Sequence, residues 1–171
     1  TYLAMHDSLT ALPNRLALQQ EIDETIIAGK PFTVVFLDLD RFKNVNESAG
    51  HVTGDRVLME MSGRLSQLLA DGDRLFRIGG DEFVLLTPAV DHRIDAKVGE
   101  MLTLAKQPIL IAGVEFTLGA TAGAASSPRD GDSYTTLIRR ADMAMYAAKR
   151  DAVGTLRRYD ARLEAITVRK L

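Results

Sequence analysis

Three carboxylates stand where short strands are expected to end. Asp38 closes the apolar run 32–38, and Asp81 and Glu82 follow a pair of glycines. Strand ends next to loops are where sheet proteins place ligands, and glycines let a ligand approach the backbone closely. Each acid alone would more often be an ordinary turn or strand-end residue. Because magnesium prefers oxygen ligands that it can share with phosphates, the three acids together predict a magnesium site.

Five motifs surround these acids in a fixed order along the chain. They are HDSLT with LPNR at 6–15, FLDLDRFK at 36–43, the set Asn46, Gly50-His51 and Gly54-Asp55, RIGGDEF at 77–83, and RADMAMYAAK at 140–149. The ordered set, from about His6 to Asp160, resembles the GGDEF family of diguanylate cyclases. The resemblance implies an enzyme that condenses two GTP into cyclic di-GMP and pyrophosphate with Mg²⁺ or Mn²⁺.

The same resemblance implies roles for the residues around the phosphates. It assigns the metal to Asp38, the Leu39 carbonyl, Asp81 and Glu82. Asp81 is further implied to help activate the attacking 3′-hydroxyl. Lys149 matches a lysine that contacts the terminal phosphates, although a cation at the end of a helix also has a purely structural use. We therefore expect a catalytic set of Asp81, Glu82, Lys43 and Lys149.

A second group of residues matches those that hold the nucleotide. Asn46 and Asp55 match the positions that read the guanine edge, and Phe42 belongs to the turn that approaches the phosphates. Gly79 and Gly80 match the glycines that let GTP lie against the loop. A carboxylate accepts from the guanine N1–H and amino group, whereas an amide can both donate and accept. Asn46 alone would equally suit a turn. The group predicts that GTP binds better than ATP.

Two departures from the family pattern affect these expectations. Val153 stands where the turn after the last long helix carries a phosphate-contacting arginine, which predicts weaker triphosphate binding. Ala70 stands where the family's product-inhibition motif carries an arginine, while its aspartate is kept as Asp73. The inhibitory site is therefore expected to be degenerate, because the product's guanine loses its planar, bidentate partner.

Hydrophobic periodicity predicts the elements that position these residues. The expected helices cover 15–28, 55–69, 95–106 and 134–150, with Asn14 and Ser133 as caps. A short helix and a polar loop are expected over 39–54. The expected strands cover 32–38, 74–78, 83–87, 109–111, 114–122 and 155–159, the second and third forming a hairpin. This order predicts an α+β fold with a mixed central sheet flanked by helices. The resemblance specifies a two-layer, ferredoxin-like palm of the nucleotide-cyclase type.

The 171 residues suit one domain. We expect residues 1–160 to form it, with 1–14 as a lead-in, and 161–171 to start a linker to an EAL phosphodiesterase domain. The net charge of −2 argues against a nucleic-acid partner. No apolar run is long enough to span a membrane. The absence of cysteine is compatible with the cytosol, so we expect a cytoplasmic segment, with a tether elsewhere in a longer protein left open.

Three functions are compatible with the sequence. The first is an active cyclase that works as a homodimer, because each protomer holds one GTP, with sensor and EAL domains attached. The second is a weakly active or inactive GTP-binding domain that regulates an attached EAL phosphodiesterase. The intact Asp81-Glu82 pair favours the first, and Val153 favours the second. A pure scaffold domain is the third, against which the retained acids and base-reading residues argue.

Overall fold

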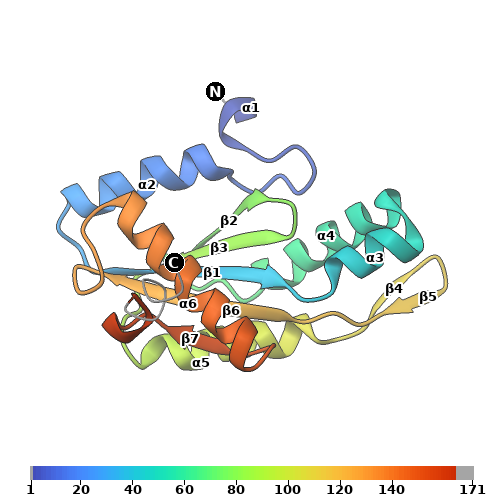
Figure 1. Cartoon of the computed structure of the whole chain (residues 1–171). Coiled ribbons are helices and arrows are strands. Elements are labelled where there is room, and N and C mark those ends of the chain that lie inside the picture. The colour runs from blue at the N-terminus through green and yellow to red at the C-terminus, as the bar shows by residue number, and fades with distance from the viewer. Residues whose placement is uncertain (1, 165–171) are drawn as a thin grey trace.

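A five-stranded mixed sheet forms the centre of the computed structural model, which describes residues 2–164 (Figure 1). The strands are ordered β2-β3-β1-β6-β7. They comprise β1 (Phe32–Leu39), β2 (Arg74–Gly79), β3 (Glu82–Thr87), β6 (Ala120–Ser127) and β7 (Leu156–Arg158). β6 and β7 pair in parallel, and the other neighbours are antiparallel. The expected mixed sheet flanked by helices is confirmed.

Helices cover both faces of this sheet (Figure 1). α2 (Arg15–Ile27) and α6 (Tyr134–Asp151) pack on one face, and α4 (His51–Ser66) and α5 (Arg93–Ala105) pack on the other. β1 supplies both cores, because side chains alternate between the two faces of a strand. Val34 and Phe36 join one core while Val35 and Leu37 join the other. This two-sided burial explains why β1 is a continuous apolar run.

Four smaller elements complete the fold. α1 (Tyr2–Met5) opens the described chain, α3 (Phe42–Ala49) follows β1, and β4 (Ile109–Ile111) pairs with β5 (Val114–Phe116) in a separate hairpin. That hairpin extends from the body of the domain near α3 and α4 (Figure 1).

The predicted caps are confirmed. The Asn14 side chain accepts from the N–H of Ala17 at the start of α2, and Ser133 accepts from the N–H of Thr136 at the start of α6. Such side chains satisfy amide groups that the first turn of a helix leaves without partners. The Ser133 cap starts α6, the helix that carries residues of the site described below.

Two predicted elements differ from the observed ones. The strand expected over 114–122 is divided, because 117–119 leave the β4–β5 hairpin and β6 then continues to Ser127. β6 is built from alanine, glycine, serine and threonine, which carry little strand signal. The helix expected from Asp55 begins earlier, at His51, because Gly50 at φ +88° ends α3 and starts α4 directly.

Small residues in β6 allow α6 to lie directly on the sheet. A Cβ built on Gly123 would lie 2.1 Å from the Met145 nitrogen and 2.2 Å from the Ala141 carbonyl oxygen. Both atoms belong to the α6 backbone, so no side-chain movement can make room. Gly123 therefore sets the distance between α6 and the sheet.

Gly123→Ala is expected to destabilise the domain strongly. Overpacking against a fixed backbone costs about 1–3 kcal/mol, and occasionally more. Gly99→Ala in α5 is the matched control, because a Cβ there meets nothing within 4 Å. That control should be neutral or stabilising, by roughly 0.5–1 kcal/mol. Thermal unfolding compares the two variants, and equal melting temperatures would contradict this role of Gly123.

The described chain ends in a helical turn at 161–164 that packs back on α6. Leu163 is buried among the residues of the α2–α6 core. The Glu164 carboxylate accepts hydrogen bonds from Arg139, Arg140 and the Tyr159 hydroxyl. The predicted linker 161–171 thus begins against the domain, and its remainder, 165–171, lies outside the described residues.

Candidate active site

Asp38 and Asp81 form a pair of carboxylates at one edge of the sheet. Asp38 is next to last in β1, and Asp81 lies in the turn between β2 and β3. The Leu39 N–H donates to the Asp81 carbonyl at 3.2 Å and so ties this turn to β1. Burial, together with the negative charge of Asp38, raises the pKa of Asp81 to about 6. Asp38 Oδ1 is buried and has no hydrogen-bond partner among the described residues.

Glu82 lies beside this pair. It is the antiparallel partner of Asp38 in the β1–β3 register, which places both side chains on the same face of the sheet. Burial, Asp38 and Asp142 raise its pKa. No three acids or histidines within residues 2–164 gather closely enough to be a ready-made metal cage. The three predicted acids therefore appear as one close pair with Glu82 adjacent.

Lys149 contacts Asp38 of this pair from α6. Its Nζ donates to Asp38 Oδ2 at 2.6 Å and lies 3.9 Å from Asp40 Oδ1. Asp40 is buried, accepts from the Thr121 hydroxyl at 2.8 Å, and has a pKa that burial raises. The structure thus brings Lys149 to Asp38 across 111 positions of sequence, while its implied contact with the terminal phosphates stays a prediction.

Two further acids of the site were missed by the sequence analysis. Asp40 was quoted in a motif without a role, although the Asp-Leu-Asp spacing puts it on the same strand face as Asp38. Asp142 lies on α6 two turns before Lys149. Burial and the charge of Asp38 raise the pKa of Asp142. The site therefore concentrates more negative charge than the three predicted acids alone.

A second, partly buried group lies where α3 meets α4. The Asn46 side-chain oxygen is buried without a hydrogen-bond partner among the described residues. Gly54 makes room for it, because a Cβ there would lie 1.8 Å from Asn46 Oδ1 and 3.3 Å from Phe42 Cζ. Phe42 is buried and lies one turn before Asn46, whereas Asp55 is exposed next to Gly54. An unpaired buried acceptor is a place where a ligand's N–H can bind.

Lys43 makes its ion pair with Glu47 and not with the acids of the site. Its ammonium is on the exposed side of α3 and pairs with Glu47 at 3.7 Å. An exposed pair one helical turn apart contributes little, roughly 0.3–0.5 kcal/mol. Its predicted role toward phosphates stays a prediction.

Arg77 donates hydrogen bonds to the turn that carries Asp81. Gly80 adopts φ +31°, and its carbonyl accepts from Arg77 Nε at 3.1 Å and Nη2 at 2.9 Å. Arg77 Nη1 binds both oxygens of Asp7. Although burial acts in the opposite direction, hydrogen bonds from Thr10 and Arg77 hold the pKa of Asp7 below its ordinary value. Segment 1–14 therefore positions the Gly79-Gly80 turn, a role that sequence analysis missed.

The two residues of the degenerate inhibitory motif, Ala70 and Asp73, lie in the connection between α4 and β2. The Asp73 side chain is 1% exposed and accepts from Lys97 Nζ at 2.6 Å. It also accepts from the Ala70 N–H at 2.9 Å. Although burial opposes the shift, these hydrogen bonds hold the pKa of Asp73 below its usual value. Asp73 is thus already engaged within the domain.

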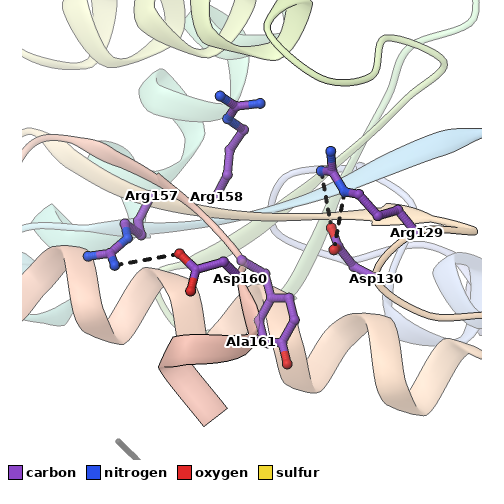
Figure 2. A pocket seen from close by; sticks show the side chains of 7 residues that line it. Arg129, Asp130, Arg157, Arg158, Asp160 and Ala161 are labelled. Carbon is purple, nitrogen blue, oxygen red and sulfur yellow. Dashed lines mark hydrogen bonds and ion pairs between the residues drawn. The ribbon is translucent and has the colours of Figure 1, made fainter. Parts of the chain in front are cut away.

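Arginines line a pocket that Figure 2 shows from close by. Arg129 follows Ser127, which pairs with Phe32 at the opposite end of β1 from Asp38. Figure 2 shows Arg129 against Asp130 and Arg157 against Asp160. Because the arginines have carboxylate partners, this pocket offers little free charge to an anion.

The fold and site define a class: palm-like α+β domains with paired carboxylates at a sheet edge. The family described as "Diguanylate cyclase, GGDEF domain" matches residues 4–154. This chain belongs to the GGDEF family. In its described part, no helix is both long and apolar enough to cross a bilayer.

Individual relatives agree with this assignment. The bifunctional diguanylate cyclase/cyclic di-GMP phosphodiesterase MucR of Pseudomonas aeruginosa is 41% identical over 152 residues, covering 86% of this chain and 22% of MucR. The cyclic di-GMP phosphodiesterase PdeR of Escherichia coli is 39% identical over 155 residues, covering 89% and 23%. A structure of the GGDEF domain of TpbB from P. aeruginosa matches with a TM-score of 0.85 at 34% identity, covering 95% of this chain and 99% of that one. The chain spans less than a quarter of MucR and PdeR.

Cyclic di-GMP is expected to bind weakly at Ala70 and Asp73. No guanidinium is present at position 70, and the Asp73 carboxylate is already bound by Lys97. A lost hydrogen bond to a charged group is worth roughly 1.5–3 kcal/mol. Calorimetric titration of cyclic di-GMP should show tighter binding by Ala70→Arg than by the wild type. Tight wild-type binding that Ala70→Glu abolishes would contradict this prediction.

Proposed function

We propose that this domain is a diguanylate cyclase, which condenses two GTP into cyclic di-GMP and pyrophosphate. The observation that carries the proposal is the Asp38–Asp81 pair, held on two connected strand ends with Lys149 against it. Membership of the GGDEF family supports the same reaction.

The residues fit a divalent cation. Asp38 Oδ1 is buried and has no hydrogen-bond partner among the described residues. The charge of Asp38 also acts on Asp81. The two carboxylates therefore offer oxygen atoms that a positive ion can bind. Hard cations such as Mg²⁺ prefer such oxygens. Asp38, the Leu39 carbonyl, Asp81 and Glu82 would hold Mg²⁺ or Mn²⁺. The bound ion neutralises charge on the phosphates.

The reaction forms a bond from the 3′-oxygen of one GTP to the α-phosphorus of the other. The bond from that phosphorus to the bridging oxygen breaks, and pyrophosphate leaves. Asp81 would accept the 3′-hydroxyl proton as general base, the role that its place in the GGDEF loop implies. When the nucleotide binds, the Lys149 ammonium would leave Asp38 and contact a phosphate oxygen. The same step between the remaining 3′-hydroxyl and the remaining α-phosphate closes the ring and releases the second pyrophosphate.

Asn46 and Asp55 would select the base. The unpartnered Asn46 oxygen can accept from guanine, and the exposed Asp55 carboxylate lies next to Gly54. Adenine carries an acceptor at N1, so it would face a carboxylate without a hydrogen between them. GTP should therefore bind more tightly than ATP.

The arrangement of the whole protein is part of the proposal. Each protomer would hold one GTP, so two protomers must meet face to face as a homodimer. Similarity to MucR and PdeR, of which the chain covers less than a quarter, supports attached sensor and EAL domains. A location in the cytoplasm would give such a domain access to GTP.

A regulatory GTP-binding role is the second candidate. Val153 is 62% exposed on the turn after α6, and this turn supplies no cation to a phosphate. The similarity to PdeR, a phosphodiesterase by name, also favours this candidate. In that case GTP would bind without turnover and control an attached phosphodiesterase.

Product analysis distinguishes the two. The wild-type domain at high concentration, with GTP and Mg²⁺, should yield cyclic di-GMP and two pyrophosphates per product. A chelator should stop the reaction, and ATP should give no cyclic product. Tight GTP binding with no cyclic di-GMP under these conditions would replace the cyclase by the regulatory function.

A further inference from the structure

Lys106, at the end of α5, passes along two glycines from distant parts of the chain. A Cβ built on Gly119 would lie 3.8 Å from Lys106 Cγ. A Cβ built on Gly154 would lie 3.5 Å from Lys106 Cε and 3.6 Å from its Nζ. The exposed side chain therefore runs from α5 past the start of β6 to the turn after α6.

This path leads to the edge of the carboxylate site. The Gly154 N–H donates to the Thr121 hydroxyl at 2.9 Å, and that hydroxyl donates to Asp40 Oδ1 at 2.8 Å. A Cβ on Gly119 would lie 3.4 Å from Asp40 Oδ2. Lys149 Nζ lies 3.9 Å from Asp40 Oδ1. Asp40 is thus adjacent to Lys149 and to Gly119, and the Thr121 hydroxyl links it to Gly154.

The ammonium of Lys106 is uncommitted. Across residues 2–164 it forms no ion pair or hydrogen bond, whereas Lys149 is held by Asp38 at 2.6 Å. Val153, the residue before Gly154, brings no charge to the same turn. A group of acids as dense as Asp38, Asp40 and Asp81 needs cations of its own if a polyphosphate is to bind beside it.

We propose that Lys106 binds the terminal phosphates of the nucleotide beside Lys149, supplying from α5 the positive charge that the turn at Val153 lacks. This inference rests on the proposed function and deepens it. A lysine suits the role because its flexible stem carries a compact charge that can reach a phosphate from the side. Its hydrogen bonds to phosphate oxygens are charge-assisted and stronger than neutral ones.

The test is calorimetric binding of an α,β-methylene analogue of GTP, which cannot turn over, and of GMP, in the presence of Mg²⁺. Lys106→Ala should weaken binding of the triphosphate by roughly tenfold or more and leave GMP binding unchanged. Lys106→Arg should keep most of the affinity. Lys30→Ala is the matched control, since Lys30 is an exposed lysine near the opposite end of β1.

A second pair of variants tests the shared role. Val153→Arg should strengthen triphosphate binding and reduce the loss that Lys106→Ala causes. Equal affinity of the wild type and Lys106→Ala for the triphosphate overturns the inference alone. An undiminished loss in the Val153→Arg background contradicts a shared role and also overturns it. A wild-type domain that binds no triphosphate overturns the proposed function and the inference together.

Discussion

Asp81→Asn is expected to abolish cyclic di-GMP formation while making the metal-free domain more resistant to heat at neutral pH. The loss of activity follows from the lost base and metal ligand, since general-base catalysis alone contributes about 10²–10⁴-fold. The gain in stability follows from the raised pKa. Burial and Asp38 raise the pKa of Asp81 from 3.8 to about 6, so its ionised form is disfavoured in the folded domain.

The pH dependence of this gain has a definite sign. Between pH 3.8 and about 6 the folded state holds the Asp81 proton more tightly than the unfolded state does. The stabilisation that the protonated Asp81 gives the folded wild type is therefore complete below the unfolded pKa. It is lost as the pH rises through about 6. Asparagine has no charge to bury, so its advantage should be small near pH 4 and full at pH 7.5.

Melting temperatures at both pH values, measured in a chelator, check this prediction. Asp23→Asn is the control, because Asp23 is an exposed acid of α2. Adding Mg²⁺ should raise the melting temperature of the wild type, since ligands that bind only the folded state stabilise it. Asp81→Asn should respond less. A variant that melts below the wild type at pH 7.5 without metal would contradict the account of Asp81.

Gly54→Ala should remove most of the preference for GTP over ATP. The added Cβ would lie 1.8 Å from Asn46 Oδ1, so the amide must leave its buried position. A buried hydrogen bond lost in this way costs roughly 1–3 kcal/mol, or about 5- to 150-fold in affinity. Calorimetry with non-reacting analogues of both nucleotides measures the change.

Gly63→Ala is the matched control for this prediction. Gly63 lies in the same helix, and a Cβ there meets nothing within 4 Å. Asn46→Ala provides a second check, because removing the amide makes room for the new methyl. The double variant should bind GTP no more weakly than Asn46→Ala alone, as expected for two neighbours that act through one contact. Additive losses would mean that Gly54 acts on something other than Asn46.

Much of this molecule follows from local signals. The run that forms β1, the caps Asn14 and Ser133, and the hairpin around Gly80 were predicted because each depends on neighbours in sequence. Ordered motifs also identified the residues that meet at the Asp38–Asp81 pair. These features need no knowledge of how distant segments pack.

The rest depends on contacts between distant segments. β6 was incompletely predicted because its small residues serve close packing against α6, which periodicity does not report. Asp73 could not be known to face Lys97, since 24 positions separate them. Lys106 carried no motif, and its relation to the site appears only when α5, Gly119 and Gly154 are brought together in space.

We propose that two copies of this domain, each holding one GTP, condense their nucleotides at facing sites. The most direct measurement is the rate of cyclic di-GMP formation per protomer, with GTP and Mg²⁺ saturating, as protein concentration increases. We predict that the rate per protomer rises with concentration and then levels off as dimers fill, with two pyrophosphates released per product. GTP binding that saturates while no cyclic di-GMP forms at any concentration, even after fusion to a dimerising coiled coil, would contradict the claim.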